Sequence, residues 1–302
     1  MPIAGHEDRI LPMAHDNVYL NGMIVPATEA KISVADAGFL HGASAFTTML
    51  AHNGVVFRLD RHLKRLMDTV ALLSLKTDTT ADQLAEAVSD LLAANELCQA
   101  RLRITLTPGN VRQDRPTTVV TAEPLPDYPS DWYQKGIGVV VTSFKQAPGD
   151  IMYGYKTGCY LPRLLARQEA AAKGAEEAIW FTTSNCLAEA CFSNVFLVLE
   201  GKAATPPAGT PVLPGVVREA VIELCAKLGV ACDAQSRLTV KEMLAAEEVF
   251  LTGSTMGIRP VVRIERHAVG DEKPGKVTKR IMKAYSDLLD AECTAPPGKA
   301  KG

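Results

Sequence analysis

The sequence predicts a two-domain α/β protein, in which a small α+β domain is followed by a larger α/β domain. Its 302 residues are enough for two folding units. Hairpin and helix signals continue to about residue 125, where a proline-rich stretch interrupts them. We therefore expect an N-terminal extension over 1–17, a small domain over 18–125, a linker over 126–135, a large domain over 136–290 and a disordered tail over 291–302.

Glycine-containing turns separate the strands expected in the small domain. Asn21-Gly22 supplies the two positive-φ positions of a type I′ hairpin turn, and His52-Asn53-Gly54 separates the next two strands. The expected strand regions are the hairpin over 18–25, then 45–51, 55–57, 101–107 and 118–122.

Two helices are expected among these strands. Asp60 can cap a helix that runs to about Ser74 and that places Leu63, Leu66, Met67, Val70 and Leu73 on one face. Thr80 and Gln83 form a capping box ahead of a second helix that ends near Asn95.

The large domain is expected to mix strands with longer helices. Strands are predicted at 138–144, 177–182 and 194–199, and helices at 161–173, from Val216 to Gly229, and at 276–289. We find no internal repeat in the sequence.

Composition excludes several classes of function. A net charge of −2 gives no basic surface for nucleic acid and no electrostatic attraction to a membrane. The first seventeen residues do not resemble a signal peptide, and the apolar runs are too short to span a bilayer. Seven cysteines and six histidines occur without metal-ligand spacing. We expect a protein of the cell interior, the cytoplasm, with reduced thiols and no bound metal.

One lysine is followed by a distinctive series of motifs. Lys156 lies in a Gly- and Tyr-rich loop, and residues 187–196, 213–219 and 250–257 follow it, while 57–66 lies upstream. In this order of motifs the chain resembles the fold-type IV pyridoxal-phosphate enzymes, which include branched-chain and D-amino-acid aminotransferases and aminodeoxychorismate lyase. The resemblance implies a D-amino-acid aminotransferase-like fold and a pyridoxal 5′-phosphate cofactor.

The resemblance assigns the two residues that engage the reactive part of the cofactor. Lys156 matches the catalytic lysine that forms the Schiff base, and Glu189 matches the carboxylate that binds the ring nitrogen. Small neighbours, Ala188 and Ala190, leave room for a flat ring. Without the motifs, Lys156 would be read as a surface charge and Glu189 as a solvated carboxylate at a strand edge.

A helix start is the expected phosphate site. The stretch 213–218 places the backbone N–H groups of Val216 and Val217 at a helix N-terminus, which favours an anion. The dipole contributes only about 0.3–1 kcal/mol when exposed, so a charge is also needed. The resemblance assigns this charge to Arg65, a contact with the cofactor to Tyr160 and a hydroxyl to Ser254. Branched-chain enzymes usually have threonine where Val217 stands, so that side-chain contact is absent here.

The expected substrate-pocket residues disagree about the substrate. The N-terminal stretch resembles branched-chain aminotransferases, yet His41 stands where those enzymes usually have tyrosine. Residues 46–48, Phe-Thr-Thr, match aminodeoxychorismate lyase instead. Arg101 and Arg103 point to one side of a strand, where they bind a substrate carboxylate or form a solvent-facing basic surface. The expected pocket residues are His41, Phe46, Thr48, Arg101, Arg103 and Thr255.

The favoured activity is transfer of an amino group between an amino acid, most closely a branched-chain one, and a 2-oxo acid. The alternatives are aminodeoxychorismate lyase, a D-amino-acid or (R)-amine transaminase, and a noncatalytic protein that binds pyridoxal phosphate. The family builds its active sites at a homodimer interface, so the resemblance also implies a homodimer.

Overall fold

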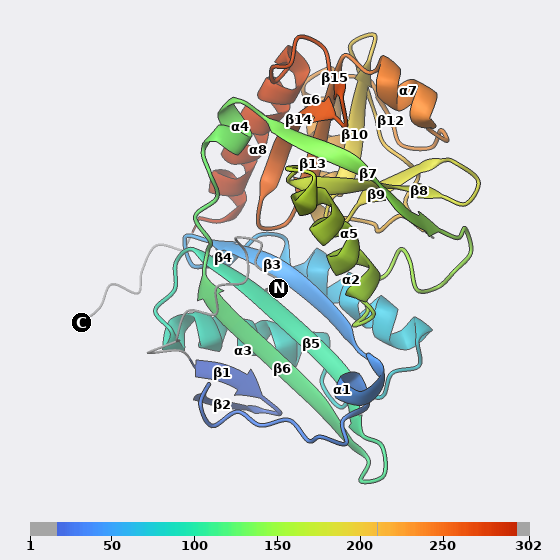
Figure 1. Ribbon diagram of the computed structural model, residues 1–302. Helices are drawn as coiled ribbons and strands as arrows, with labels where there is room; N and C mark the ends of the chain where they lie inside the picture. Colours follow the sequence, from blue (N-terminus) through green and yellow to red (C-terminus); the bar gives the residue numbers. More distant parts are fainter. Residues whose placement is uncertain (1–16, 210, 295–302) are drawn as a thin grey trace. The chain divides into compact units, whose positions relative to one another are not determined.

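The computed structural model describes residues 17–209 and 211–294, which form two compact units (Figure 1). The N-terminal unit consists of residues 17–126 together with 286–294, and the C-terminal unit consists of residues 127–285. The predicted N-terminal extension, apart from Asn17, and the predicted tail beyond residue 294 lie outside the described residues.

The N-terminal unit contains a six-stranded antiparallel sheet with the order β2-β1-β6-β5-β3-β4. Both predicted hairpins are confirmed: Asn21 and Gly22, then Asn53 and Gly54, have positive φ angles at the two turns. The strands are β1 (Asn17–Leu20), β2 (Met23–Pro26), β3 (Ala45–His52), β4 (Val55–Val56), β5 (Ala100–Asn110) and β6 (Arg115–Pro124).

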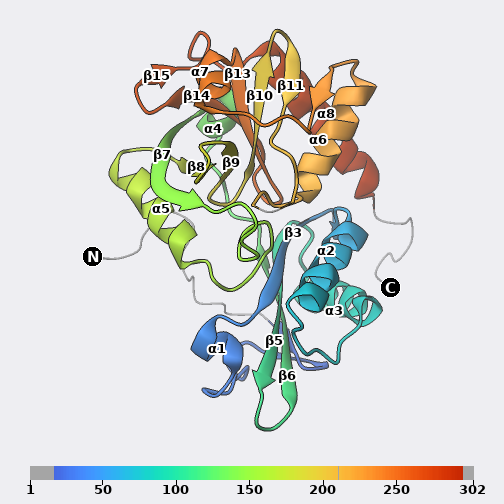
Figure 2. The ribbon, with the colours of Figure 1, turned by 90° about the vertical axis from the view of Figure 1, so that its right-hand side faces the viewer.

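Two helices cover one side of this sheet, as Figure 2 shows: α2 (Leu59–Leu72) and α3 (Ala81–Ala94). The predicted capping box of α3 is confirmed, because Thr80 and Gln83 exchange both hydrogen bonds. The predicted cap Asp60 is wrong. A left-handed residue, Arg58, precedes α2, so Asp60 lies inside the first turn, where its charge still favours the helix dipole.

The helices and the sheet enclose a single apolar core. Alternate strand residues point toward α2 and α3, so Phe46, Thr48 and Leu50 of β3 and Arg101, Arg103 and Thr105 of β5 lie on the other face. The core contains Ala45, Met49, Ala51, Val56, Leu63, Leu66, Val70, Leu84, Ala87, Val88, Leu91, Leu92, Ala100, Leu102, Ile104, Leu106, Val120 and Ala122.

The end of the last helix also belongs to the N-terminal unit. This helix, α8 (Lys276–Glu292), extends three residues past its predicted end at Leu289. Asp290 accepts a hydrogen bond from His52 Nε2 at 2.8 Å, and Glu292 forms an ion pair with Arg58 at 3.1 Å. The apolar pattern of the helix does not signal these polar attachments.

The C-terminal unit contains a nine-stranded mixed sheet with the order β12-β11-β10-β13-β14-β7-β8-β9, and β15 pairs with β14. Three pairs are parallel: β11 with β12, β14 with β7, and β7 with β8. The strands are β7 (Ile137–Gln146), β8 (Glu177–Thr182), β9 (Leu187–Ala190), β10 (Asn194–Leu199), β11 (Lys202–Ala204), β12 (Cys232–Asp233), β13 (Glu248–Gly253), β14 (Gly257–Ile264) and β15 (His267–Ala268).

Helices pack on both faces of this sheet. The predicted helices are confirmed as α5 (Leu161–Ala172), α6 (Val216–Lys227) and α8. The sequence patterns did not predict the short helices α1 (Ala37–His41), α4 (Asp131–Gln134) and α7 (Val240–Ala245). Helix α4 lies within the predicted linker. None of the helices in the described residues is long and apolar enough to cross a membrane.

Small residues bring α5 close to the sheet. Ala166 and Ala170 are fully buried in one apolar cluster with Ala178, Ala188 and Trp180, and the helix packs on β7 and β8. This close approach places the N-terminal end of α5 beside the strand that carries Glu189.

Candidate active site

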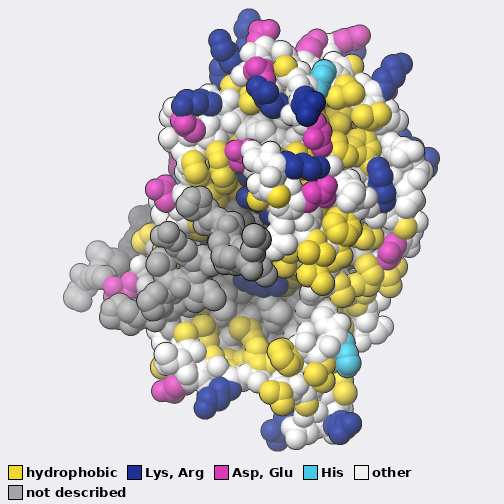
Figure 3. All heavy atoms as spheres, viewed as in Figure 1, with side chains coloured by type: hydrophobic (Ala, Val, Ile, Leu, Met, Phe, Trp, Pro, Cys, Tyr) yellow, Lys and Arg dark blue, Asp and Glu magenta, His cyan; other side chains and the backbone are white. Residues whose placement is uncertain are grey.

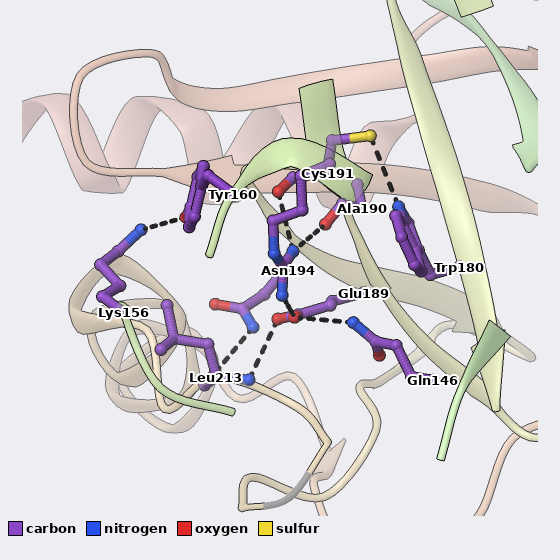
Figure 4. Close-up of polar contacts among 10 residues, drawn as sticks. Gln146, Lys156, Tyr160, Trp180, Glu189, Ala190, Cys191, Asn194 and Leu213 are labelled. Carbon is purple, nitrogen blue, oxygen red and sulfur yellow. Dashed lines mark hydrogen bonds and ion pairs between the residues drawn. The ribbon is translucent and has the colours of Figure 1, made fainter. Parts of the chain in front are cut away.

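Lys156 and Tyr160 form a hydrogen-bonded pair at the start of α5. Lys156 Nζ donates to the Tyr160 phenol oxygen at 3.1 Å (Figure 4). The Tyr160 ring stacks on Phe192 with 5.8 Å between ring centroids. Burial alone would raise the pKa of Tyr160, but the cations of Lys156 and Arg163 lower it below its usual value. The Tyr160 phenol is therefore more acidic than an isolated tyrosine.

Glu189 is a buried carboxylate on β9, with 2% of its surface exposed. Its Oε1 accepts hydrogen bonds from Arg163 at 2.5 Å and from Gln146 at 3.3 Å. Its Oε2 accepts one from the backbone N–H of Leu213 at 3.0 Å. The solvated alternative for Glu189 is therefore excluded, because the carboxylate is buried and three donors orient it.

Leu213 joins this carboxylate to the start of α6. Its N–H donates to Glu189, while its carbonyl accepts from Asn194 Nδ2 at 2.8 Å, as Figure 4 shows. Two residues later, a Cβ atom on Gly215 would lie only 2.0 Å from Asn194 Oδ1. Glycine is therefore required at position 215 because of this close approach, since its φ of −73° is open to any residue.

The N-terminus of α6 offers backbone donors directly after Gly215. Val216 and Val217 are the first two residues of the helix, and the N–H groups of a first turn have no carbonyl partner within the helix. No side chain among the described residues caps this end. The Val217 side chain is buried, so only its backbone can serve an anion.

Ser254 and Thr255 lie in the turn between β13 and β14. The Tyr128 phenol donates to Thr255 Oγ1 at 3.1 Å, and the Tyr133 phenol donates to the carbonyl of Met256 at 3.0 Å. Burial raises the pKa of Tyr133 to about 12, against an opposing effect of Arg259, so this phenol is a neutral donor over the physiological range. Two tyrosines from the predicted linker thus hold the turn that carries Ser254.

Arg65 lies in the N-terminal unit, on α2. Its Nη2 donates to Thr47 Oγ1 at 3.3 Å and lies 3.4 Å from His62 Nδ1. Thr47 Oγ1 and His62 Nδ1 are themselves 3.0 Å apart, and both residues are buried. His62 and Arg65, three residues apart on α2, therefore interact directly, and Thr47 contacts both.

Most of the predicted substrate residues lie on the face of the N-terminal sheet that points away from α2 and α3. Arg103 stacks over Phe46, with 3.6 Å from Cζ to the ring centroid, and its Nε donates to Thr105 at 3.1 Å. Thr48 lies directly opposite Arg103 in the ladder between β3 and β5. Arg101 is on the same face but forms an ion pair with Glu123 at 3.4 Å. Arg103, Thr48 and Arg101 thus place polar groups beside the buried Phe46 ring, and Arg101 is partly exposed to solvent.

His41 is exposed at the C-terminal end of α1. Helix α1 is fixed by Asp36, whose Oδ1 accepts from the N–H of Gly38 at 2.7 Å. The hydroxyls of Thr107 and Thr117 donate to Asp36 Oδ2 at 2.9 and 2.7 Å. The absence of helical periodicity in so short a segment explains why the sequence patterns missed α1.

The sequence predictions did not include Arg163, which contacts Glu189. It lies in the first turn of α5 and is buried together with Glu189. Burial alone would lower its pKa, but the Glu189 carboxylate raises it above its usual range. Its signal was available in the sequence: Arg163, Ala166 and Ala170 share one face of the predicted helix, and a charge on a buried face requires a partner.

The predicted residues thus divide between the two units. Lys156, Tyr160, Glu189, Val216, Val217, Ser254 and Thr255 belong to the C-terminal unit, and His41, Phe46, Thr48, Arg65, Arg101 and Arg103 belong to the N-terminal unit. Among the described residues, no group of acidic, histidine or cysteine side chains could hold a metal ion.

Comparison with known proteins decides the family. The model of the family described as amino-transferase class IV matches residues 44–264. The chain belongs to this family. It is 31% identical over 291 residues to the branched-chain-amino-acid aminotransferase of Escherichia coli K12, covering 92% of this chain and 94% of that relative.

Solved structures agree on the fold, which is that of the fold-type IV pyridoxal-phosphate enzymes. The E. coli branched-chain amino acid aminotransferase superposes with a TM-score of 0.88 at 30% identity, covering 94% of this chain and 98% of that one. The enzyme of the same name from T.th., solved with pyridoxamine 5′-phosphate, gives 0.86 at 26%, covering 92% and 95%. The 4-amino-4-deoxychorismate lyase of Pseudomonas aeruginosa gives 0.78 at 26%, covering 90% and 99%.

Proposed function

We propose that the chain binds pyridoxal 5′-phosphate through Lys156 and is an aminotransferase acting on a branched-chain-like amino acid and a 2-oxo acid. The observation that carries this proposal is the chain of contacts from Glu189 through Leu213 to the start of α6. These contacts connect the buried Glu189 carboxylate, through the single residue Leu213, to the N-terminus of α6, where we expect an anion to bind.

The donor set of the C-terminal unit fits this cofactor. A carboxylate has about four lone-pair positions, and three are used by Arg163, Gln146 and Leu213. One position on Oε2 can therefore accept a protonated ring nitrogen. The N–H groups of Val216 and Val217 and the hydroxyl of Ser254 suit a phosphate. We predict that Arg65 supplies the positive charge that these neutral donors lack.

Lys156 is proposed to carry the proton-transfer chemistry. Pyridoxal phosphate, when bound, withdraws electrons from the substrate and so acidifies its Cα–H bond. Lys156 Nζ would accept the Cα proton and deliver it to the acceptor carbon, while the Tyr160 hydroxyl at 3.1 Å keeps Nζ oriented. Glu189 Oε2 would accept a hydrogen bond from the protonated ring nitrogen.

The aminotransferase proposal is supported by the family match and by the branched-chain relatives. One observation favours the lyase as a second candidate. Thr48 faces Arg103 across the ladder beside Phe46, and the lyase from P. aeruginosa is among the structural neighbours. A hydroxyl next to a cation at this place could serve elimination as well as carboxylate binding.

Assays without any added oxo acid distinguish the candidate activities. A transaminase given L-leucine releases one equivalent of oxo acid per active site and then stops. The lyase given aminodeoxychorismate releases pyruvate over many turnovers. A protein that only binds the cofactor gives neither product, which would overturn the proposed activity while leaving cofactor binding intact. A panel of L-branched, L-acidic and D-amino acids and (R)-amines then defines the donor.

We also propose that the protein is a homodimer. Three leucines of α5 are strongly exposed for apolar side chains: Leu161 at 65%, Leu164 at 40% and Leu165 at 41%. Figure 3 shows hydrophobic side chains gathered on the face over α5. Sedimentation should give twice the chain mass of 32.4 kDa, and Leu164→Glu with Leu165→Glu should shift it toward one copy. Monomers in the unmodified protein at micromolar concentration would contradict the proposal.

A further inference from the structure

Arg163 is a buried cation whose guanidinium makes several hydrogen bonds within the C-terminal unit. Its Nη2 donates to Glu189 Oε1 at 2.5 Å, and its Nη1 donates to the carbonyls of Ala190 and Cys191 at 3.2 and 2.8 Å. The guanidinium therefore holds both the carboxylate and the backbone that follows it. Because the guanidinium is planar and its donors have fixed directions, these contacts fix the orientation of Glu189.

The same guanidinium lies against two aromatic rings. Its Cζ is 5.5 Å from the ring centroid of Tyr160 and 5.9 Å from that of Trp180. Tyr160 in turn accepts the hydrogen bond of Lys156 Nζ. Arg163 is thus in contact with Glu189 on one side and with the partner of Lys156 on the other.

Arg163 also distinguishes the two oxygens of Glu189. Oε1 accepts from Arg163 and Gln146, so its lone pairs are used within the protein. Oε2 accepts only from the N–H of Leu213 among the described residues. Oε1 is therefore occupied by hydrogen bonds within the protein, while Oε2 has a lone pair that can accept a hydrogen bond from a ligand.

We propose that Arg163 is a positioning residue for the cofactor: it fixes the Glu189 carboxylate with Oε1 occupied, and it keeps a permanent positive charge beside Tyr160 and Lys156. This inference rests on the proposed function, because it concerns pyridoxal phosphate held at Glu189. The ionisable groups that face Arg163 are Glu189 on β9, Tyr160 before α5 and Cys191 after β9. Arginine stays charged over the whole accessible pH range, so its effect on these neighbours is constant.

The central test is the pH titration of visible absorbance in protein loaded with pyridoxal phosphate. Removal of a nearby positive charge raises the proton affinity of its neighbours, so Arg163→Gln should move the midpoint upward by about one pH unit. Arg163→Lys keeps the charge and should stay within about 0.3 unit of the unmodified protein. Arg167→Gln, one turn further along α5, is the matched control and should not shift it. A purely structural Arg163 would leave the midpoint unchanged.

The fixed orientation of Glu189 is tested by cofactor affinity. Lysine cannot reach the carboxylate and both carbonyls together, so Arg163→Lys should weaken the Kd for pyridoxal phosphate by about tenfold. Arg167→Gln should leave the Kd unchanged. An unchanged Kd in Arg163→Lys would overturn the positioning role, and this variant decides the matter even where Arg163→Gln does not fold.

The ligand-free protein supplies a second readout. Arg163→Gln leaves a buried carboxylate without its charged partner and should lower the unfolding temperature by roughly 10 °C. The double variant Arg163→Gln, Glu189→Gln removes both charges and should recover at least half of that loss. Additive losses in the double variant would show that the two side chains do not depend on each other, which would overturn the inference.

The outcomes distinguish this inference from the proposed function. If the unmodified protein binds no pyridoxal phosphate, both fail, while the thermal cycle still reports the coupling of Arg163 to Glu189. If it binds the cofactor and the variants leave midpoint and Kd unchanged, only the role of Arg163 fails.

Discussion

The two units support their candidate residues in different ways. In the C-terminal unit, Glu189 and the start of α6 are fixed by backbone groups and a buried ion pair. In the N-terminal unit, Arg103 and Thr48 lie on the sheet face that points away from α2 and α3, and the contacts of Arg103 include the Phe46 ring and the Thr105 hydroxyl. Backbone contacts and buried charges tolerate little change, whereas side chains on a sheet face can be exchanged without altering the fold. We therefore expect substitutions around Glu189 and the start of α6 to disturb the structure more than substitutions at Arg103 or Thr48.

Lys156→Ala should have the largest effect. Because the amine is both the attachment point and the proton carrier, kcat/KM should fall by about 10⁴-fold or more. Steady-state kinetics with L-leucine and 2-oxoglutarate would measure it. Lys173→Ala, on the exposed end of α5, is a matched control and should keep full activity. Comparable activity in Lys156→Ala would remove the lysine from the chemistry.

Glu189→Gln should come next. Glutamine fills the same space but cannot keep the ring nitrogen protonated, so kcat should fall by about 10²–10³-fold. It also leaves Arg163 without its counter-ion, so thermal unfolding must be measured alongside kinetics. A folded variant with unchanged kcat would contradict the proposed role of this carboxylate.

Gly215→Ala tests the backbone part of the comparison. Its new Cβ would meet Asn194 Oδ1 at 2.0 Å and displace the start of α6, so the Kd for pyridoxal phosphate should weaken by about 10- to 100-fold. Gly138→Ala is the control, because its Cβ would have its nearest neighbour at an ordinary 3.6 Å. Equal effects of the two substitutions would show that close packing at Gly215 does not shape the site.

Arg103→Met tests the side-chain part. Loss of the cation should raise KM for amino acids and oxo acids by about tenfold and leave the Kd for pyridoxal phosphate within about twofold. Arg101→Met should have a smaller effect, since Arg101 is already paired with Glu123. A larger increase of KM in Arg101→Met than in Arg103→Met would indicate that Arg101, and not Arg103, binds the substrate.

Tyr133→Phe should have the smallest effect. The pKa of Tyr133 is raised to about 12, so the folded protein holds the neutral phenol while the unfolded chain ionises near its ordinary value of about 10. The stabilising contribution is therefore complete below pH 10 and is lost as the pH rises toward 12. The Tm difference between the unmodified protein and Tyr133→Phe should shrink over that range. A constant difference would contradict the raised pKa.

Sequence patterns predicted most of the regular elements, whereas the cofactor residues came from the family resemblance and stay predictions. The hairpin turn at Asn21 and the capping box at Thr80 depend on local chemistry, which the sequence shows directly. The wrong cap at Asp60 came from a left-handed Arg58, a conformation that its residue type does not favour.

Other features depended on contacts between distant residues. Strand β9 has four residues, too few for a periodic signal, although it carries Glu189. The bond from Arg163 to Glu189 joins residues 26 positions apart, and the role of Leu213 depends on its backbone alone. The helix pattern indicates that Arg163 needs a partner, but no local pattern identifies Glu189 as that partner or predicts the contact of Leu213. The substrate residues stay predictions for the same reason.

The most direct test of the central claim is to treat the protein with pyridoxal phosphate, reduce it with borohydride and locate the label by peptide mass spectrometry. The account predicts one pyridoxyl group per chain, carried by Lys156. A label at another lysine, or no label after saturation with the cofactor, would contradict it.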